Sequence, residues 1–117
     1  DLRKDFNVPN LPVVIGALGQ HGSGDPSENM KKVQVAQMAM NQVADFKGNV
    51  KSIYTHTLVD KEAERVFPGW QDHFEEWGKV GSDRPYHYLG SAIWFSRIGH
   101  AFADEMLVLL KYADGKK

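Results

Sequence analysis

The stretch Leu11-Pro12-Val13-Val14-Ile15-Gly16-Ala17-Leu18 decides the fold. It is a short, continuous apolar run, rich in β-branched residues and bounded by proline and glycine, which is typical of a strand buried on both faces. Pro12 fits only at its start, because proline cannot donate to a sheet ladder. The stretch therefore predicts a central strand of a parallel sheet, and such a strand needs a neighbour on each side.

A glycine-rich loop, 19–24, follows this strand. Asp25 as N-cap and Pro26 at the first helical position then predict the start of a helix. Apolar residues such as Val33 recur at helical spacing and predict one buried face. Gly48 is a natural stop for this helix.

Residues 50–58 predict a second strand, because β-branched and aromatic residues dominate them. A helical turn is expected at 61–65, and Pro68 predicts the start of a further helix. Ser91 is a good N-cap for a long final helix with a broad apolar stripe. Gly99 inside that helix predicts close packing against a neighbouring element.

The order strand, helix, strand, helices follows the βαβ logic of a parallel sheet, so we expect an α/β fold. With 117 residues the chain is long enough for one small domain and too short for two, so we expect 1–117 to belong to a single domain. About two parallel strands give a thin core, since independent stability usually takes three or more. We therefore expect the sheet to be completed by a missing N-terminal half or by another subunit.

Composition narrows the classes of partner. The formal net charge is −1, so neither nucleic acid nor an anionic membrane is an expected partner. The absence of cysteine removes disulfides, thiolate metal sites and a cysteine nucleophile. The N-terminus shows no signal-peptide pattern and does not begin with methionine.

The histidines are the groups that can transfer protons near neutral pH. His87 lies in the loop before the last helix, a place where open α/β folds gather reactive groups, and a histidine there can act as general base to a serine. The alternative is a structural histidine packed between two tyrosines. His21, in the glycine-rich loop, is either a substrate contact or a solvated loop residue, and His56 either enters the same crevice or packs against a helix.

Other chemistries have weaker support. His21, His56, His87 and Asp60 are ligand types that suit zinc, but no HxH or HExxH spacing supports a metal site, so we expect none. Ser23 lies in a loop near a strand end but lacks the G-x-S-x-G elbow of a nucleophile. No cofactor is expected.

Two further blocks complete a pattern with the first strand: Tyr86-His87-Tyr88-Leu89-Gly90-Ser91-Ala92 and Ile98-Gly99-His100-Ala101-Phe102-Ala103-Asp104-Glu105-Met106-Leu107. With Leu11 to Gln20, they resemble the C-terminal part of sialate O-acetylesterase-like carbohydrate esterases of the SGNH hydrolase superfamily. The resemblance covers most of the chain.

The resemblance implies a flavodoxin-like three-layer α/β/α fold and a secreted or periplasmic esterase that removes acetyl groups from carbohydrates through an acyl-serine. The family's C-terminal histidine maps onto His87, and Gln20 and His21 are expected to line the sugar site. The family's aspartate three residues before the histidine is Arg84 here, so Asp83 is the expected acidic partner, with Asp60 or a dyad without an acid as alternatives. No Gly-Gln-Ser or Gly-Asp-Ser block is present. The nucleophile and oxyanion hole would then lie outside this chain, which we expect to be inactive alone.

The competing hypothesis is a non-catalytic α/β binding or assembly module that has lost the nucleophile block and uses its exposed sheet edge for association.

Overall fold

The computed structural model describes residues 2–114 as a mixed α/β chain. The regular elements are α1 (Leu2–Asp5), β1 (Val13–Ala17), α2 (Glu28–Ala39), β2 (Val50–Tyr54), α3 (Lys61–Val66), α4 (Phe74–Trp77) and α5 (Ala92–Asp114). Short 3-10 helices connect them: η1 (Met40–Gln42), η2 (Ala44–Phe46), η3 (His56–Leu58), η4 (Trp70–His73) and η5 (Tyr88–Gly90).

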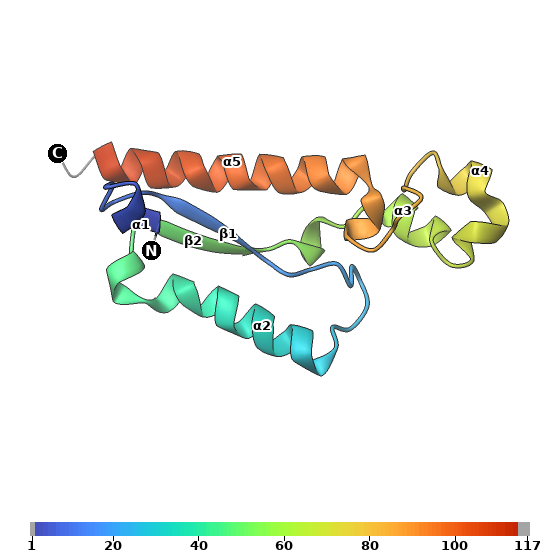
Figure 1. Cartoon of the computed structure of the whole chain (residues 1–117), viewed down its shortest axis with the longest axis horizontal. Helices are drawn as coiled ribbons and strands as arrows, with labels where there is room; N and C mark the ends of the chain where they lie inside the picture. The colour runs from blue at the N-terminus through green and yellow to red at the C-terminus, as the bar shows by residue number, and fades with distance from the viewer. Residues whose placement is uncertain (1, 115–117) are drawn as a thin grey trace.

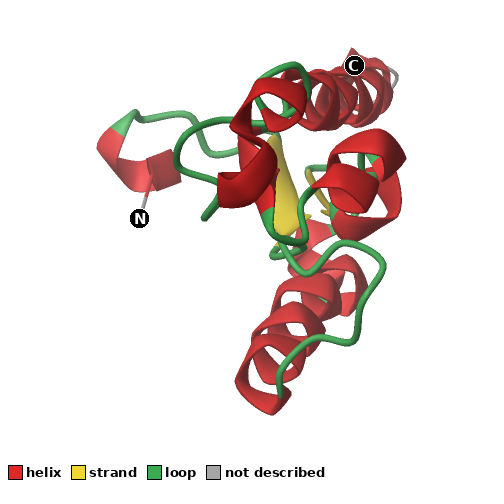
Figure 2. Ribbon diagram, turned by 90° about the vertical axis from the view of Figure 1, so that its right-hand side faces the viewer, coloured by secondary structure: helices red, strands yellow, loops and turns green. Residues whose placement is uncertain are grey.

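The two strands form a parallel pair, in register from Val13 opposite Val50 to Ala17 opposite Tyr54. They lie between α5 on one face and α2 on the other (Figure 1), and the view along the long axis shows the same arrangement (Figure 2). The predicted α/β class, the parallel pairing and the crossover through α2 are thus confirmed. Because parallel strands end together, Ala17 and Tyr54 mark one carboxyl edge of the sheet.

Side chains alternate between the two faces, as a strand requires. Ser52 faces α2, where its Oγ donates to the Gln37 carbonyl over 2.7 Å. Gly16 faces α5, because a Cβ there would lie 2.7 Å from the ring of Phe102. α5 therefore packs on β1 where the strand carries no side chain.

In the described part of the chain, β1 pairs with β2 alone. The prediction of a strand with helices over both faces is confirmed, but the strand is not central within this chain. Its residues 13–16 are half-buried, and Ala17 is buried. The outer edge of β1 therefore remains free of a strand partner here.

The start of α2 differs from the prediction. Ser27, not Asp25, caps the helix, and its side chain accepts from the Met30 amide. Val33, predicted to be buried, is 42% exposed, whereas the polar Gln34 is buried. The face of α2 turned to the sheet therefore includes Gln34, whose amide donates to the Leu18 carbonyl, a bond that an apolar side chain cannot supply.

Three elements are shorter than their patterns predicted. α2 ends at Ala39 and passes into η1 and η2, whereas the prediction extended it toward Gly48. β2 ends at Tyr54, and the predicted strand residues 56–58 form η3. The helix expected after Pro68 is split into η4 and α4 at His73, whose φ of −137° and ψ of 50° are not helical.

α3 and α5 confirm their predictions. Asp60 caps α3 by accepting from the amides of Glu62 and Ala63, and Ser91 caps α5 by accepting from the Trp94 amide over 3.2 Å. Gly99 is a correction: a Cβ built there meets nothing within 4 Å, so it marks no close packing. Of residues 2–114, no helix combines the length and apolar composition needed to cross a membrane.

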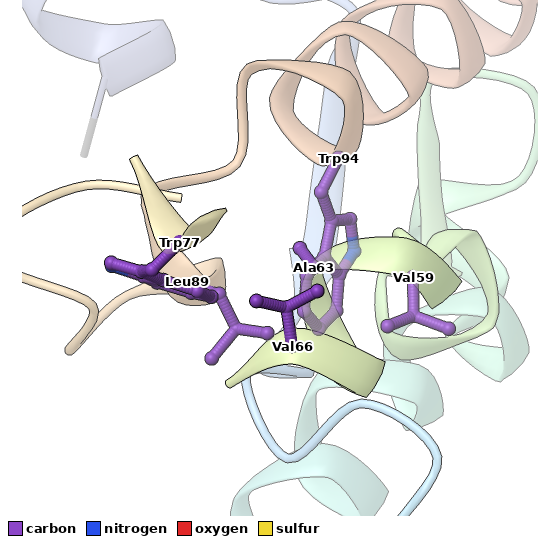
Figure 3. Packing of buried hydrophobic residues seen from close by; sticks show 6 residues of the cluster. All are labelled: Val59, Ala63, Val66, Trp77, Leu89 and Trp94. Carbon is purple, nitrogen blue, oxygen red and sulfur yellow. The ribbon is translucent and has the colours of Figure 1, made fainter. Parts of the chain in front are cut away.

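The main apolar cluster lies beyond the carboxyl ends of the strands, where α3, α4 and the start of α5 meet (Figure 3). It comprises Val59, Ala63, Val66, Trp77, Leu89 and Trp94. Trp77 and Trp94 have no exposed surface. This cluster fixes the loop that carries His87, because Leu89 of that loop is one of its members.

The molecule is elongated, with extents of 57 × 28 × 24 Å and a radius of gyration of 17.1 Å. A compact chain of this length would have a radius of about 13 Å. The accessible surface is 8044 Å², against about 6,400 Å² for a compact monomer of this mass. The chain therefore exposes about 1,600 Å² more surface than a compact monomer of its size.

Candidate functional site

The segment after His87 adopts an unusual backbone. Tyr88 and Leu89 have φ values of 50° and 57°, and Gly90 follows at 63°. Left-handed conformations at residues other than glycine cost about 1 kcal/mol or more each and persist only where the surroundings enforce them. The burial of Leu89 in the apolar cluster supplies part of that enforcement. Such strain concentrates at functional sites.

A hydrogen-bonded chain fixes the same turn to the carboxyl edge of the sheet. Thr55 Oγ1 lies 2.7 Å from the Ala17 carbonyl oxygen and 2.8 Å from the Tyr88 hydroxyl. The carbonyl can only accept, so the one hydroxyl proton of Thr55 goes to Ala17. Tyr88 must then donate to Thr55. This chain links the residue after His87 to the last residue of β1 and the first residue after β2.

His87 lies on the loop that enters α5, next to Tyr88, whose hydroxyl reaches the carboxyl edge of the sheet. The side chain of His87 is exposed, so it is not enclosed in the apolar core. Asp83 is also exposed, and between these two described residues there is no hydrogen bond or ion pair. The imidazole is therefore open to groups from outside the chain.

Asp60 has a different role from the one considered as an alternative partner for His87. It is buried, its Oδ2 accepts from Ser91 Oγ over 2.6 Å, and its Oδ1 caps α3. Both carboxylate oxygens are thus used to join the starts of α3 and α5. Asp60 stabilises the frame around the His87 loop.

His21 and His56 come together on the α2 side of the same edge. Their ring centroids are 4.7 Å apart in an edge-to-face arrangement. Both rings line a cavity of about 580 Å³, together with Tyr54, Lys31 and residues of the glycine-rich loop. His21, predicted to line the sugar site, is one of the residues that line this cavity. Gln20, predicted with it, is half-buried in the adjoining turn and does not line the cavity.

Gln34 completes this group and was missed by the sequence analysis. Its Nε2 donates to the Leu18 carbonyl and lies 3.3 Å from His21 Nε2. Burial, and secondly the nearby His56, lower the pKa of His21 below its ordinary value, against weaker opposing effects of Asp25 and Glu64. The available signal was a glutamine that interrupts the apolar spacing of a predicted helix.

Ser23 is held by α3. Its amide donates to Glu64 Oε1 over 2.5 Å, its hydroxyl donates to Glu64 Oε2 over 2.6 Å, and Lys61 Nζ donates to the hydroxyl oxygen. Burial alone would raise the pKa of Glu64, but the hydrogen bonds from Ser23 and Lys61 lower it. A serine whose proton is donated to a carboxylate is not activated by a histidine, so this cluster orders the loop.

No three His, Asp or Glu side chains converge as a metal would require within the part of the chain that the structure describes. Comparisons with models of protein families, with curated proteins and with solved structures each find no match to this chain. The candidate site therefore has to be interpreted from its own geometry.

Proposed function

We propose that this chain is the histidine-bearing C-terminal part of a carbohydrate O-acetylesterase of the SGNH type. The observation that supports it best is the placement of His87: exposed, on the loop that enters α5, beside a strained turn that Thr55 and Tyr88 hold at the carboxyl edge of a parallel sheet. In the complete enzyme the fold would be the flavodoxin-like three-layer form.

The proposed chemistry assigns one proton path to His87. Its imidazole removes the proton from a serine supplied by other polypeptide, and the serine oxygen attacks the acetyl carbonyl carbon. The imidazolium then returns the proton to the departing sugar hydroxyl. Water, activated by the same imidazole, releases acetate from the acyl-serine. Asp83 is the proposed partner that would orient the imidazole when the loop closes on substrate.

The proposed partner polypeptide completes the sheet. The outer edge of β1 has no strand beside it in the described chain, and unpaired strand edges favour association. The large exposed surface supports the same proposal.

The test compares the complete polypeptide with the 117-residue chain, using an aryl acetate and an acetylated sugar as substrates. We expect no turnover by the chain alone. In the complete enzyme, His87→Ala should lower turnover by about 10²- to 10⁴-fold. His100→Ala is the matched control, since His100 is exposed on α5. Appreciable turnover by the pure chain, or near-normal activity of His87→Ala, would refute the proposal.

A second candidate is the non-catalytic assembly module. The open edge of β1 and the lack of a carboxylate bonded to His87 among the described residues favour it. It predicts that the purified chain binds its partner with an affinity that His87→Ala leaves unchanged, and that the complex has no esterase activity.

A further inference from the structure

The loop 18–24 leads from β1 toward α2, and its residues 21–24 line the cavity. Two sets of polar contacts hold it: Ser23 is bonded to Glu64 of α3, and Leu18 and His21 contact α2 and His56. Leu18 is bound through both backbone groups to α2: its amide donates to Gln37 Oε1 over 2.9 Å, and its carbonyl accepts from Gln34 Nε2. His21 contacts Gln34 on one side and the ring of His56 on the other.

The protons in this cluster can be assigned. The Leu18 carbonyl only accepts, so the atom of Gln34 that bonds it is the amide nitrogen, and an amide nitrogen only donates. His21 Nε2, 3.3 Å from the same nitrogen, must therefore be the acceptor. The imidazole of His21 is then neutral, with its proton on Nδ1. That Nδ1 is buried and has no hydrogen-bond partner among the described residues, and neither has His56 Nδ1.

We propose that His21, Gln34 and His56 form a proton-sensitive latch that holds the loop 18–24 against α2 at neutral pH and releases it on acidification. Protonation of His21 places a hydrogen on Nε2, which then faces the donating amide of Gln34. Two donors cannot bond each other, so this contact becomes repulsive. The same event places a positive charge in a poorly solvated position beside His56.

The charged groups around His21 have opposing effects. Asp25, on its own loop, and Glu64, on α3, favour the protonated form. Glu64 is already bonded to Ser23 and Lys61, and Lys31 on α2 lines the same cavity with a positive charge. Burial and His56 outweigh the two acids, and the pKa of His21 is lowered as a result.

The direction of the pH effect follows. A base whose pKa is lower in the folded state than in the unfolded state, for which 6.5 is the reference here, binds fewer protons when folded. The contribution of the latch to stability is therefore complete above pH 6.5 and is lost as the pH falls through the folded pKa of His21. The Nδ1 atoms of His21 and His56 are covered, so a ligand in the cavity does not reach these two atoms.

The experiment is an NMR titration of the 117-residue chain, with ring nitrogen shifts used to identify the tautomer of His21. We expect a neutral imidazole protonated on Nδ1 at pH 7.5, with a pKa below 6.5. Gln34→Glu replaces the donor with an acceptor, so it should raise the pKa of His21. Gln37→Glu is the matched control: it adds the same charge one turn away on α2 but keeps the acceptor for Leu18, and it should change the pKa of His21 much less.

Hydrogen exchange measures the release itself. After correction for the intrinsic pH dependence, exchange in residues 18–22 should rise about tenfold for each unit by which the pKa of His21 lies below its unfolded value. The Ser23 amide should change less, because Glu64 of α3 holds it. Amides of α5 should remain protected. Three results would each overturn the proposal. The neutral ring of His21 could carry its proton on Nε2, or its pKa could be at or above 6.5. The third is loop protection that does not follow the titration of His21. The wild-type measurements decide it even where Gln34→Glu fails to fold.

Discussion

Thr55→Val tests how the His87 loop is attached to the sheet. Valine matches threonine in shape but has no hydroxyl, so the change removes the bonds to Ala17 and Tyr88, of 2.7 and 2.8 Å. Thr55 is 2% exposed, so water cannot replace them. At about 1 kcal/mol for each hydrogen bond, the loss is about 2 kcal/mol. For a chain of this length that lowers Tm by about 8 °C.

The assay is urea unfolding followed by tryptophan fluorescence, with Thr57→Val as the control. Thr57 is exposed, and its hydroxyl donates to the Tyr54 carbonyl over 3.0 Å, so this variant should lose less than about 0.5 kcal/mol. Tyr88→Phe should cost about 1 kcal/mol alone and almost nothing in the Thr55→Val background, because the acceptor is already gone. Equal stabilities of the two valine variants, or additive effects of Thr55→Val and Tyr88→Phe, would refute the hydrogen-bonded chain.

Three further predictions concern the frame around the site. Ser91→Ala removes a buried cap and leaves Asp60 without its donor, so we expect a loss of about 3 kcal/mol in urea unfolding. Gly16→Ala places a methyl group against an aromatic ring of α5 and should lower the free energy of unfolding by about 2 kcal/mol. Gly99→Ala meets open space and should raise it by about 0.5–1 kcal/mol. Equal effects of the two variants would contradict this packing. The pKa of Glu64 is lowered on folding. Its contribution to the free energy of unfolding should therefore be present above pH 4.5 and be lost as the pH falls through the folded pKa. Ser23→Ala should reduce this pH dependence in urea unfolding.

The sequence was sufficient to predict the elements whose signals are local and unopposed. The apolar run around Val13–Ala17 and the β-branched run at Val50–Tyr54 became strands because few other conformations suit such residues. Ser91 became the cap of α5 because a serine before a long apolar-periodic segment has a clear use. The α/β class followed from the order of these elements.

Where two local signals compete, the residue predicted from the pattern is wrong. Asp25 and Ser27 are both good caps, and the structure uses Ser27, whose side chain accepts from the Met30 amide. Gln34 is polar within an apolar pattern, and only the position of Leu18 in space explains its burial. For His56 the sequence left two alternatives open, entry into the same crevice or packing against a helix. Its position after the second of two parallel strands allows the first alternative, but only the structure shows the ring contact with His21.

The free edge of β1 and the position of His87 are connected by the geometry of parallel sheets. A strand that paired with the outer edge of β1 in parallel would end at the same carboxyl edge as Ala17. The residues after that strand would then lie near the turn that Tyr88 anchors through Thr55 to Ala17. The same association would cover part of the surface by which this chain exceeds a compact monomer. One partner strand would thus satisfy the unpaired backbone of β1 and bring new groups within reach of His87. If the proposed function holds, folding and esterase activity would depend on the same contact.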